Sequence, residues 1–260
     1  MIGDIMNYFV EGLQGSGKST LVNKIAKKYP DHMVFREGDY SPVELAWCAY
    51  VSEEEYQSIT DKYSDIRRLI EEKSHTEKDH KIICYTQVIT DIPGFHKDLE
   101  QYEIYNGRRS FEEFKNIVFS RYRQWNGDNM IFECSLFQNI IEDMILYRDA
   151  SDREIMEFYT ELREILRDRD YHILYLETDD IADSIGTIRK ERSDDNGNEM
   201  WFPLMMEFFD HSPYAEKRGI SGEEELLKHF AHRQELELKI CRKLLADKVS
   251  VLRSRNYTEF

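Results

Sequence analysis

The nine residues "GLQGSGKST" at positions 12–20 decide the fold of this chain, and they follow the short apolar run "YFVE" at 8–11. The pattern Gly12-x-x-x-x-Gly17-Lys18-Ser19 is that of a P-loop. Glycines let backbone N–H groups converge on an anion without a Cβ in the way, and the following helix adds its N-terminal dipole. We therefore predict that this loop binds the phosphates of a nucleoside triphosphate.

Within the loop, Lys18 is expected to bridge the β- and γ-phosphates, and Ser19 is expected to bind Mg²⁺. The flanking sequence agrees, because a strand pattern precedes the loop and "KSTLVNKIAKKY" at 18–29 has a helical apolar face that ends before Pro30. We expect the loop to lie at the surface, with ATP and Mg²⁺ as its ligands. The predicted nucleotide-binding residues are Gly12, Gly15, Ser16, Gly17, Lys18, Ser19 and Thr20.

Short apolar runs separated by helical patterns extend through the rest of the chain. Because most runs are apolar on both faces, they indicate a buried parallel sheet whose crossovers place helices on both sides. The sequence predicts a single P-loop NTPase domain over 1–260, a three-layer α/β/α fold with a five-stranded parallel sheet. The predicted strands are Tyr8–Glu11, Met33–Arg36, Met130–Glu133, His172–Leu176 and Val249–Leu252.

Two segments do not fit this alternation. Residues 40–129 are largely helical in pattern and rich in aromatics, which predicts a helical insertion. Residues 184–213 contain the polar run "RKERSDDNGN" and are predicted to include a mobile segment at 184–198, since "RSDDNGN" at 192–198 offers almost nothing to bury. Two later helices are each expected to begin with a capping box, one at Ser151 with Glu154 and the other at Ser221 with Glu224.

Composition limits the classes of partner. The 260 residues carry a net charge of −16, which argues against nucleic-acid binding because phosphate backbones are held by clustered Lys and Arg. Four cysteines lie far apart without a C-x-x-C, so we expect buried thiols rather than a disulfide framework or a zinc site. With no signal peptide and no long apolar run, we expect a cytoplasmic protein without a membrane partner, and a homodimer remains open.

The sequence favours a kinase over a regulatory GTPase. Asp91–Gly94 matches D-x-x-G, but no N-K-x-D follows a later strand, so we interpret this segment as a Pro-Gly turn. Acidic residues end the second and third predicted strands, where they lie at the mouth of a parallel sheet. There one carboxylate can hold Mg²⁺-bound water and another can accept a proton. These residues are Glu37, Asp39 and Glu133.

Four motifs in order resemble the deoxynucleoside kinase and thymidylate kinase group of P-loop kinases. They are "GLQGSGKST", "REGD" at 36–39, "IFECS" at 131–135 and "RKER" at 189–192. The resemblance implies that Glu37 meets the acceptor as a general base and that Glu133 lies in the triplet that ends the third strand, near Mg²⁺. It also implies that Arg189 and Arg192 form an R-x-x-R lid that reaches the transferring phosphoryl group.

The acceptor pocket is assigned to the insertion. Gln87 stands where the group often reads a base edge, Asp39 is a further acceptor contact, and Arg108 and Arg109 could meet an acceptor phosphate. The chain also departs from the group, because Cys134 stands where its triplet has an arginine. This departure leaves the acceptor open between nucleosides and other molecules such as a sugar, an amino alcohol or an antibiotic.

These observations lead to a function hypothesis with alternatives. The first is an ATP-dependent phosphotransferase that moves the γ-phosphate of Mg-ATP to a small molecule, with a nucleoside or nucleotide-like acceptor favoured. A kinase for nucleoside monophosphates belongs to the same class and needs arginines rather than a base. The alternative from another class is a regulatory protein that senses ATP through its lid. Carboxylates such as Glu37 and Glu133 favour the enzyme, since a sensor needs no acceptor machinery.

Overall fold

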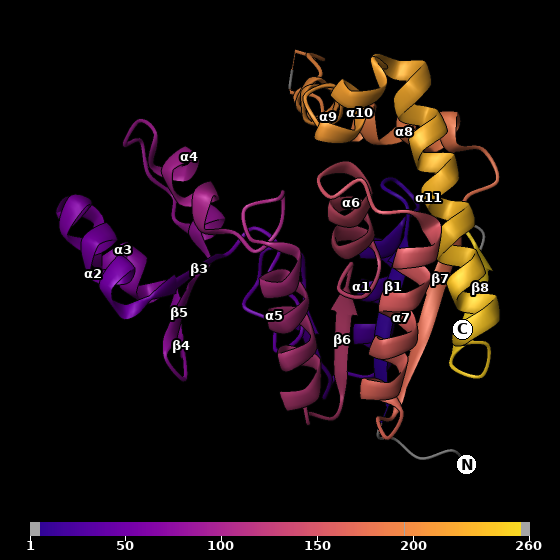
Figure 1. Cartoon of the computed structure of the whole chain (residues 1–260), viewed down its shortest axis with the longest axis horizontal. Coiled ribbons are helices and arrows are strands. Elements are labelled where there is room, and N and C mark those ends of the chain that lie inside the picture. Colours follow the sequence, from indigo (N-terminus) through magenta and orange to yellow (C-terminus); the bar gives the residue numbers. More distant parts are fainter. Residues whose placement is uncertain (1–5, 195, 256–260) are drawn as a thin grey trace. The chain divides into compact units, whose positions relative to one another are not determined.

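The computed structural model describes residues 6–194 and 196–255. Its main sheet has five strands in the order β2-β6-β1-β7-β8 (Figure 1). Phe9 at the centre of the sheet lies opposite Phe132 on one side and Ile173 on the other, in parallel register. The five predicted strands and the predicted three-layer fold are therefore confirmed. The strands are β1 (Asn7–Gly12), β2 (Met33–Phe35), β6 (Met130–Glu133), β7 (Tyr171–Glu177) and β8 (Val249–Arg253).

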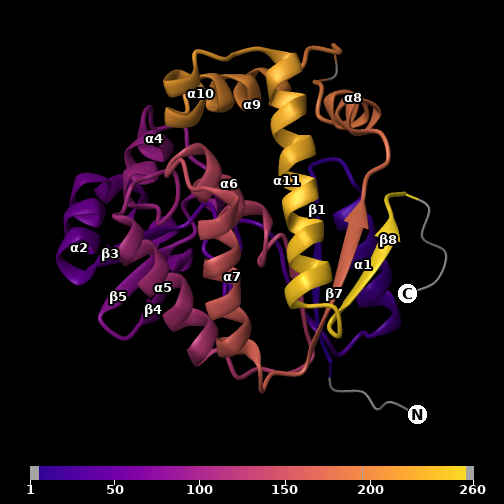
Figure 2. The same cartoon turned by 45° about the vertical axis from the view of Figure 1, so that its right-hand side comes forward.

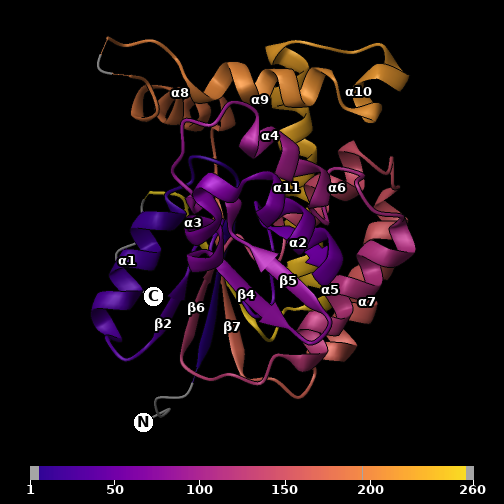
Figure 3. The ribbon, with the colours of Figure 1, turned by 90° about the vertical axis from the view of Figure 1, so that its left-hand side faces the viewer.

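Helices cover both faces of this sheet (Figure 3). Alternate strand residues point to opposite sides, so Val10 packs on helix α1 (Lys18–Lys28) in one apolar cluster. On the other face, Tyr175 contacts Phe137 and donates a hydrogen bond to Glu237 of helix α11. The helices on that side are α6 (Gln138–Leu146), α7 (Asp152–Leu166) and α11 (Glu223–Leu244).

One predicted capping box is confirmed and the other is wrong. Ser151 caps α7, and Glu154 completes the capping box. Helix α11 instead begins after Gly222, whose φ of 93° suits glycine and whose N–H donates to Asp210. Because Gly222 takes the capping position, Ser221 lies one residue outside the helix and cannot cap it.

Three further helices gather beyond the carboxyl ends of the strands (Figure 2). They are α8 (Ile181–Glu191), α9 (Trp201–Asp210) and α10 (Pro213–Arg218). The predicted lid, residues 184–213, covers most of α8 and all of α9, and its Asp195 lies outside the described residues. Over the described ranges, none of the helices combines the length and apolar character needed to cross a bilayer.

The chain divides into two compact units, one formed by the residues up to Val34 and from Asn126 onward, and the other by Phe35–Trp125. We call them the sheet unit and the inserted unit. The inserted unit holds a three-stranded antiparallel sheet that the sequence analysis did not predict (Figure 1). Its strands, in the order β3-β5-β4, are β3 (Ala49–Ser52), β4 (Ser74–Glu77) and β5 (His80–Ile83).

Helices surround this small sheet and supply most of the unit's core. Tyr63, Ile70, Phe95 and Leu99 pack against strand residues such as Val51 in one buried cluster. The α-helices are α2 (Glu53–Lys62), α3 (Arg67–Glu72), α4 (Phe95–Leu99) and α5 (Phe111–Gln124). Short 3-10 helices span Ser64–Ile66, Tyr85–Gln87 and Glu100–Tyr102. All four cysteines of the chain are buried, as expected.

Candidate functional site

The glycine-rich loop joins β1 to α1 and passes between two other parts of the sheet unit. Gly12 has a φ of 138°, and a Cβ there would lie 2.6 Å from the carbonyl oxygen of Leu176 at the end of β7. Gly15 has a φ of 76°, and its Cβ would lie 2.7 Å from the carbonyl oxygen of Ser184 in α8. Both positions therefore need glycine, for backbone conformation and for space.

The start of α1 is arranged for an anion. Gly17 precedes the helix without a capping side chain, and the first turn holds no acidic residue. Lys18 is only 7% exposed, and its Nζ donates to the carbonyl oxygens of Gly12 at 2.9 Å and Leu13 at 2.7 Å. The prediction of a surface loop is thus wrong for Lys18, because its long side chain folds back along the loop. Phosphate oxygens can replace these carbonyls as its acceptors.

Ser19 and Glu133 come together beside the loop. The hydroxyl of Ser19, in the first turn of α1, donates to a carboxylate oxygen of Glu133 at 2.5 Å. Glu133 ends β6, the direct neighbour of β1, and is 7% exposed. Hydroxyl and carboxylate oxygens are the ligands that Mg²⁺ prefers. The pair therefore fits the predicted metal site, although no cluster of three or more His, Cys, Asp or Glu that could hold a metal occurs in the described part of the chain.

Cys134 follows Glu133 in an unusual backbone conformation. Its φ is 59°, its side chain is buried, and its Sγ lies 3.6 Å from Oε1 of Gln138 in the first turn of α6. A buried thiol supplies no positive charge, whereas the group that the motifs resemble has an arginine here. Any cation that serves the acceptor must come from elsewhere in this chain.

The two arginines of the predicted lid, Arg189 and Arg192, both contact other side chains of the sheet unit. Arg189 binds both carboxylate oxygens of Glu199 at 2.8 and 3.0 Å and donates to Glu223 at 2.9 Å. Its guanidinium also lies 3.9 Å from the centre of the Phe202 ring. Arg192, at the end of α8, stacks at 5.5 Å over Trp201. The structure thus places Arg189 in α8 and Arg192 at its end, and it pairs Arg189 with acidic groups.

In the inserted unit, two predicted acceptor residues lie together. Nε2 of Gln87 donates to Oδ1 of Asp39 at 2.9 Å and to the carbonyl oxygen of Gly38 at 3.0 Å. The other carboxylate oxygen of Asp39 accepts the N–H of Arg36 at 2.8 Å. Glu37 lies in the same turn as Asp39, two positions after β2 ends, and is half-buried. The structure therefore brings the side chains of Asp39 and Gln87 together and places Glu37 two residues before Asp39 in the chain.

The two arginines predicted to meet an acceptor phosphate, Arg108 and Arg109, have different surroundings. Arg109 donates to the carbonyl oxygen of Tyr50 at 2.8 Å, and so it supports β3. Arg108 is exposed at a turn closed by its own N–H, which donates to the carbonyl oxygen of Tyr105. The structure leaves Arg108 as the more accessible of the two for an acceptor phosphate.

Several buried polar residues were not found from the sequence. Arg121, 6% exposed, donates to Glu77 and to the carbonyl oxygen of Ser41. Burial raises the pKa of Glu44 to about 8 and that of Glu103 to about 7. A signal for Arg121 was present, because it lies on the apolar face of α5 together with Phe114, Val118 and Tyr122. A charged residue on such a face needs a buried partner.

Three of the solved structures that the chain resembles are kinases, at low similarity. A deoxyadenosine kinase from M. mycoides with bound dATP is 14% identical at a TM-score of 0.40, with 97% of this chain and 93% of that chain covered. A shikimate kinase from Bacteroides thetaiotaomicron is 10% identical at 0.36, with 98% and 90% covered. A gluconokinase from Sinorhizobium meliloti 1021 is 11% identical at 0.34, with 97% and 84% covered.

No protein-family model matches the sequence, and no curated protein matches it either. The fold assignment therefore rests on this chain's own strand order and on the loop between β1 and α1.

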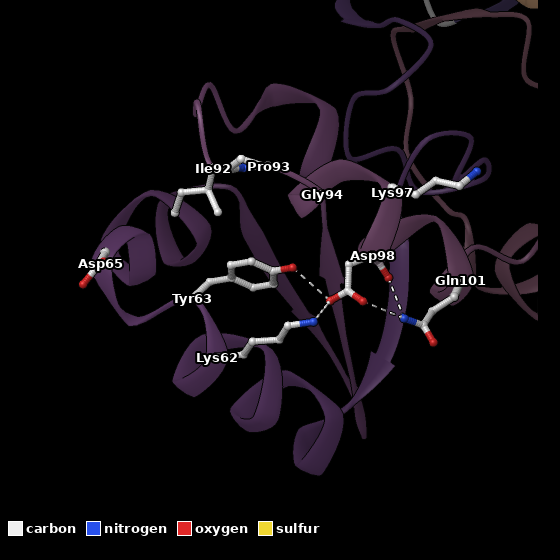
Figure 4. A pocket seen from close by; sticks show the side chains of 9 residues that line it. All are labelled: Lys62, Tyr63, Asp65, Ile92, Pro93, Gly94, Lys97, Asp98 and Gln101. Carbon is white, nitrogen blue, oxygen red and sulfur yellow. Dashed lines mark hydrogen bonds and ion pairs between the residues drawn. The ribbon is translucent and has the colours of Figure 1, made fainter.

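A hollow of about 780 Å³ opens on the inserted unit (Figure 4). Several of its polar groups are already paired, since Lys62 and the hydroxyl of Tyr63 both donate to Asp98, at 2.8 and 3.1 Å. Gly94, with a φ of 79°, turns the chain into α4 at its rim, which confirms that the Asp91–Gly94 segment ends in a turn. The lining residues are Lys62, Tyr63, Asp65, Ile92, Pro93, Gly94, Lys97, Asp98 and Gln101.

Proposed function

We propose that this chain is a phosphotransferase that moves the γ-phosphate of Mg-ATP to a small molecule, with a nucleoside or nucleotide-like acceptor favoured. The observation that carries the proposal is the pair of Ser19 and Glu133, 2.5 Å apart, beside the buried Lys18. An anion-binding helix start, a cation and two oxygen ligands, one in α1 and one at the end of β6, are the parts that phosphoryl transfer requires.

Each residue has a role in this mechanism. Lys18 would leave its two carbonyl partners for the β- and γ-phosphates, and the backbone N–H groups of the loop would bind the remaining oxygens. Ser19 and Glu133 would hold Mg²⁺, directly or through water. When bound, Mg²⁺ neutralises charge on the phosphates and orients them. Arg189 and Arg192 would stabilise the transferring group when the lid helices release them from Glu199 and Trp201.

The acceptor is assigned to the turn that holds Glu37 and Asp39, together with Gln87, which contacts Asp39. Glu37 would accept the proton of an attacking hydroxyl as the new O–P bond forms. Asp39 and Gln87 offer a carboxylate and an amide side by side, and these groups can read the donors and acceptors on the edge of a ring. This pairing supports a nucleoside-like acceptor over a plain sugar.

The test is a screen of ADP release by the full chain with Mg-ATP against nucleosides, nucleoside monophosphates, sugars and aminoglycosides. We expect turnover with a nucleoside, and none with the Lys18→Ala variant. Turnover only with a monophosphate would remove the base from the mechanism, and turnover only with a sugar or aminoglycoside would overturn the acceptor class. Calorimetric binding of ATP without transfer to any acceptor would instead favour the nucleotide sensor.

A further inference from the structure

A buried ionic network lies behind the nucleotide loop. Arg233 of α11 is fully buried and pairs with Glu142 of α6, at 2.5 Å, and with Glu237 one turn along its own helix, at 3.2 Å. His229 lies 3.1 Å from Glu142, and the hydroxyl of Tyr175 donates to Glu237 at 2.6 Å. The network therefore joins three elements, α6, α11 and β7.

This network reaches the loop through one side chain. Nη2 of Arg233 donates to Oε1 of Gln14 at 2.6 Å. Gln14 stands at one of the four unspecified positions of the P-loop pattern, so the motif alone assigns it no role. A guanidinium is a planar fork, and here its nitrogens face Glu142, Glu237 and Gln14. The ion pairs with Glu142 and Glu237 therefore fix the position of the Arg233 side chain, and its Nη2 binds the loop.

The contact between Arg233 and Gln14 restricts the loop, because of where Gln14 lies in it. It lies between Gly12 and Gly15, whose positive φ values show that both use the freedom of glycine. A glycine-rich segment loses more conformational entropy on ordering than others do. A side chain anchored between the two glycines reduces the number of loop conformations before any ligand arrives, and pre-organisation of this kind increases affinity.

We propose that Arg233 is a positioning residue for nucleotide binding, which holds the loop through Gln14 in the conformation that presents its backbone N–H groups to the phosphates. The inference rests on the proposed function only in that the ligand is a nucleoside triphosphate. Arg233 touches no reacting atom in this scheme, so its removal should change the affinity for ATP and leave turnover at saturating ATP close to that of the wild type.

The experiment compares Gln14→Leu, Arg233→Lys and the double variant by calorimetry with Mg-ATP and by steady-state kinetics. Leucine has a similar size without the carbonyl, and lysine can pair with Glu142 but has no fork to reach the loop. We expect each single variant to bind Mg-ATP about 5–50-fold more weakly, because a hydrogen bond to a charged group contributes more than a neutral one. The double variant should bind Mg-ATP no more weakly than the single variant that binds it less well, because both changes remove the same contact.

Arg148→Lys is the matched control, because Arg148, just after the end of α6, and Asp143 of α6 form another largely buried ion pair, with 2.5 Å between Nε and Oδ2. It should lower the melting temperature and leave ATP affinity unchanged. Unchanged affinity in Gln14→Leu, or effects that multiply in the double variant, would overturn the inference. Gln14→Leu decides the matter even if Arg233→Lys does not fold. A wild-type protein that binds no Mg-ATP would defeat the proposed function itself.

Discussion

Lys18 shows how a single side chain can stabilise the free loop and still serve a ligand. Its ammonium donates to two carbonyls of its own loop, so the loop is held together before ATP arrives. In the proposed function, ATP would exchange these acceptors for phosphate oxygens, which carry full charge and form stronger bonds. The same residue would then contribute both to the stability of the fold and to the affinity for nucleotide.

Lys18→Ala should abolish phosphoryl transfer and lower the affinity for ATP. It should also reduce the free energy of unfolding by about 1–3 kcal/mol, because the carbonyls of Gly12 and Leu13 lose a buried donor. Calorimetry with Mg-ATP and chemical denaturation measure the two effects separately. Lys27→Ala, an exposed lysine on the same helix, should change neither. Wild-type ATP affinity in Lys18→Ala would contradict the assignment of the loop.

Glu37 and Glu133 should respond differently to the same substitution. Glu37→Gln removes the proposed base and should lower turnover on a hydroxyl acceptor by about 10²–10⁴, with little change in ATP affinity. Glu133→Gln keeps an oxygen near Ser19 but removes its charge, so it should raise the Mg²⁺ concentration needed for half-maximal rate. Rates measured across a Mg²⁺ titration distinguish the two. Near-normal turnover in Glu37→Gln would exclude it as the base.

The loop could be predicted from the sequence because its chemistry is local, with every essential residue type inside nine positions. Arg233 could not, because its burial depends on Glu142 and Gln14, which lie far away along the chain. Helix α11 buries Arg233 and Glu237 among apolar side chains such as Phe230. A single sequence does not show which distant carboxylate neutralises a buried arginine.

At the scale of elements, α8 carries the groups that we expect to change partners. Arg189 is paired with Glu199 and Glu223. The side chain of Arg189 is 26% exposed, and those of Glu199 and Glu223 are 38% and 51% exposed. Ion pairs at such exposed positions typically contribute only about 0–1 kcal/mol. A triphosphate can therefore displace these carboxylates at a small cost.

ATP should protect residues 184–198 from proteolysis, because the arginines would then hold the lid against the phosphates. Limited digestion with and without Mg-ATP, read by mass spectrometry, measures the protection. Arg189→Gln should remove most of it. Arg242→Gln is the control, since Arg242 is an exposed residue of α11 that pairs with Glu177 of β7. Cleavage that is indifferent to ATP in the wild type would show that α8 is not a lid.

The elements of the sheet unit were easier to predict than those of the inserted unit. The central strands β1, β6 and β7 are short apolar runs that are largely buried on both faces, and Ser151 begins α7 with a local capping signal. Strands β4 and β5 are instead largely polar, with the sequence "SHTEKDHKII" over 74–83 and a turn at Lys78, where φ is 47°. Nothing in that segment has the alternation of a half-buried strand, so the antiparallel sheet was not predicted.

At the scale of the whole molecule, buried carboxyl groups give stability a dependence on pH. Burial raises the pKa of Glu11 and that of Glu44 to about 8, from 4.5. Between pH 4.5 and about pH 8 the folded chain holds protons that the unfolded chain has released, so the free energy of unfolding falls as the pH rises. Each group contributes a slope of up to about 1.4 kcal/mol per pH unit in that window.

Glu44→Gln should flatten this slope, because an amide does not titrate and can still accept the N–H of Ala46. Its stability relative to the wild type should rise steadily from pH 5 to pH 8. Urea denaturation at several pH values provides the measurement, and Glu54→Gln, an exposed position on α2, is the control. An unchanged slope in Glu44→Gln would contradict the raised pKa of this carboxyl.

The position of the inserted unit between neighbouring strands has a consequence for synthesis on the ribosome. Strand β1 leaves the exit tunnel early, but its neighbours β6 and β7 follow only after the whole inserted unit has been made. At typical elongation rates β1 waits on the order of ten seconds, while Phe35–Trp125, a continuous stretch with its own core, is free to fold first. Nascent chains arrested once Trp125 has emerged should therefore resist protease over the inserted unit and remain cleavable near β1. A chaperone that binds apolar strands should find its main target in those first residues.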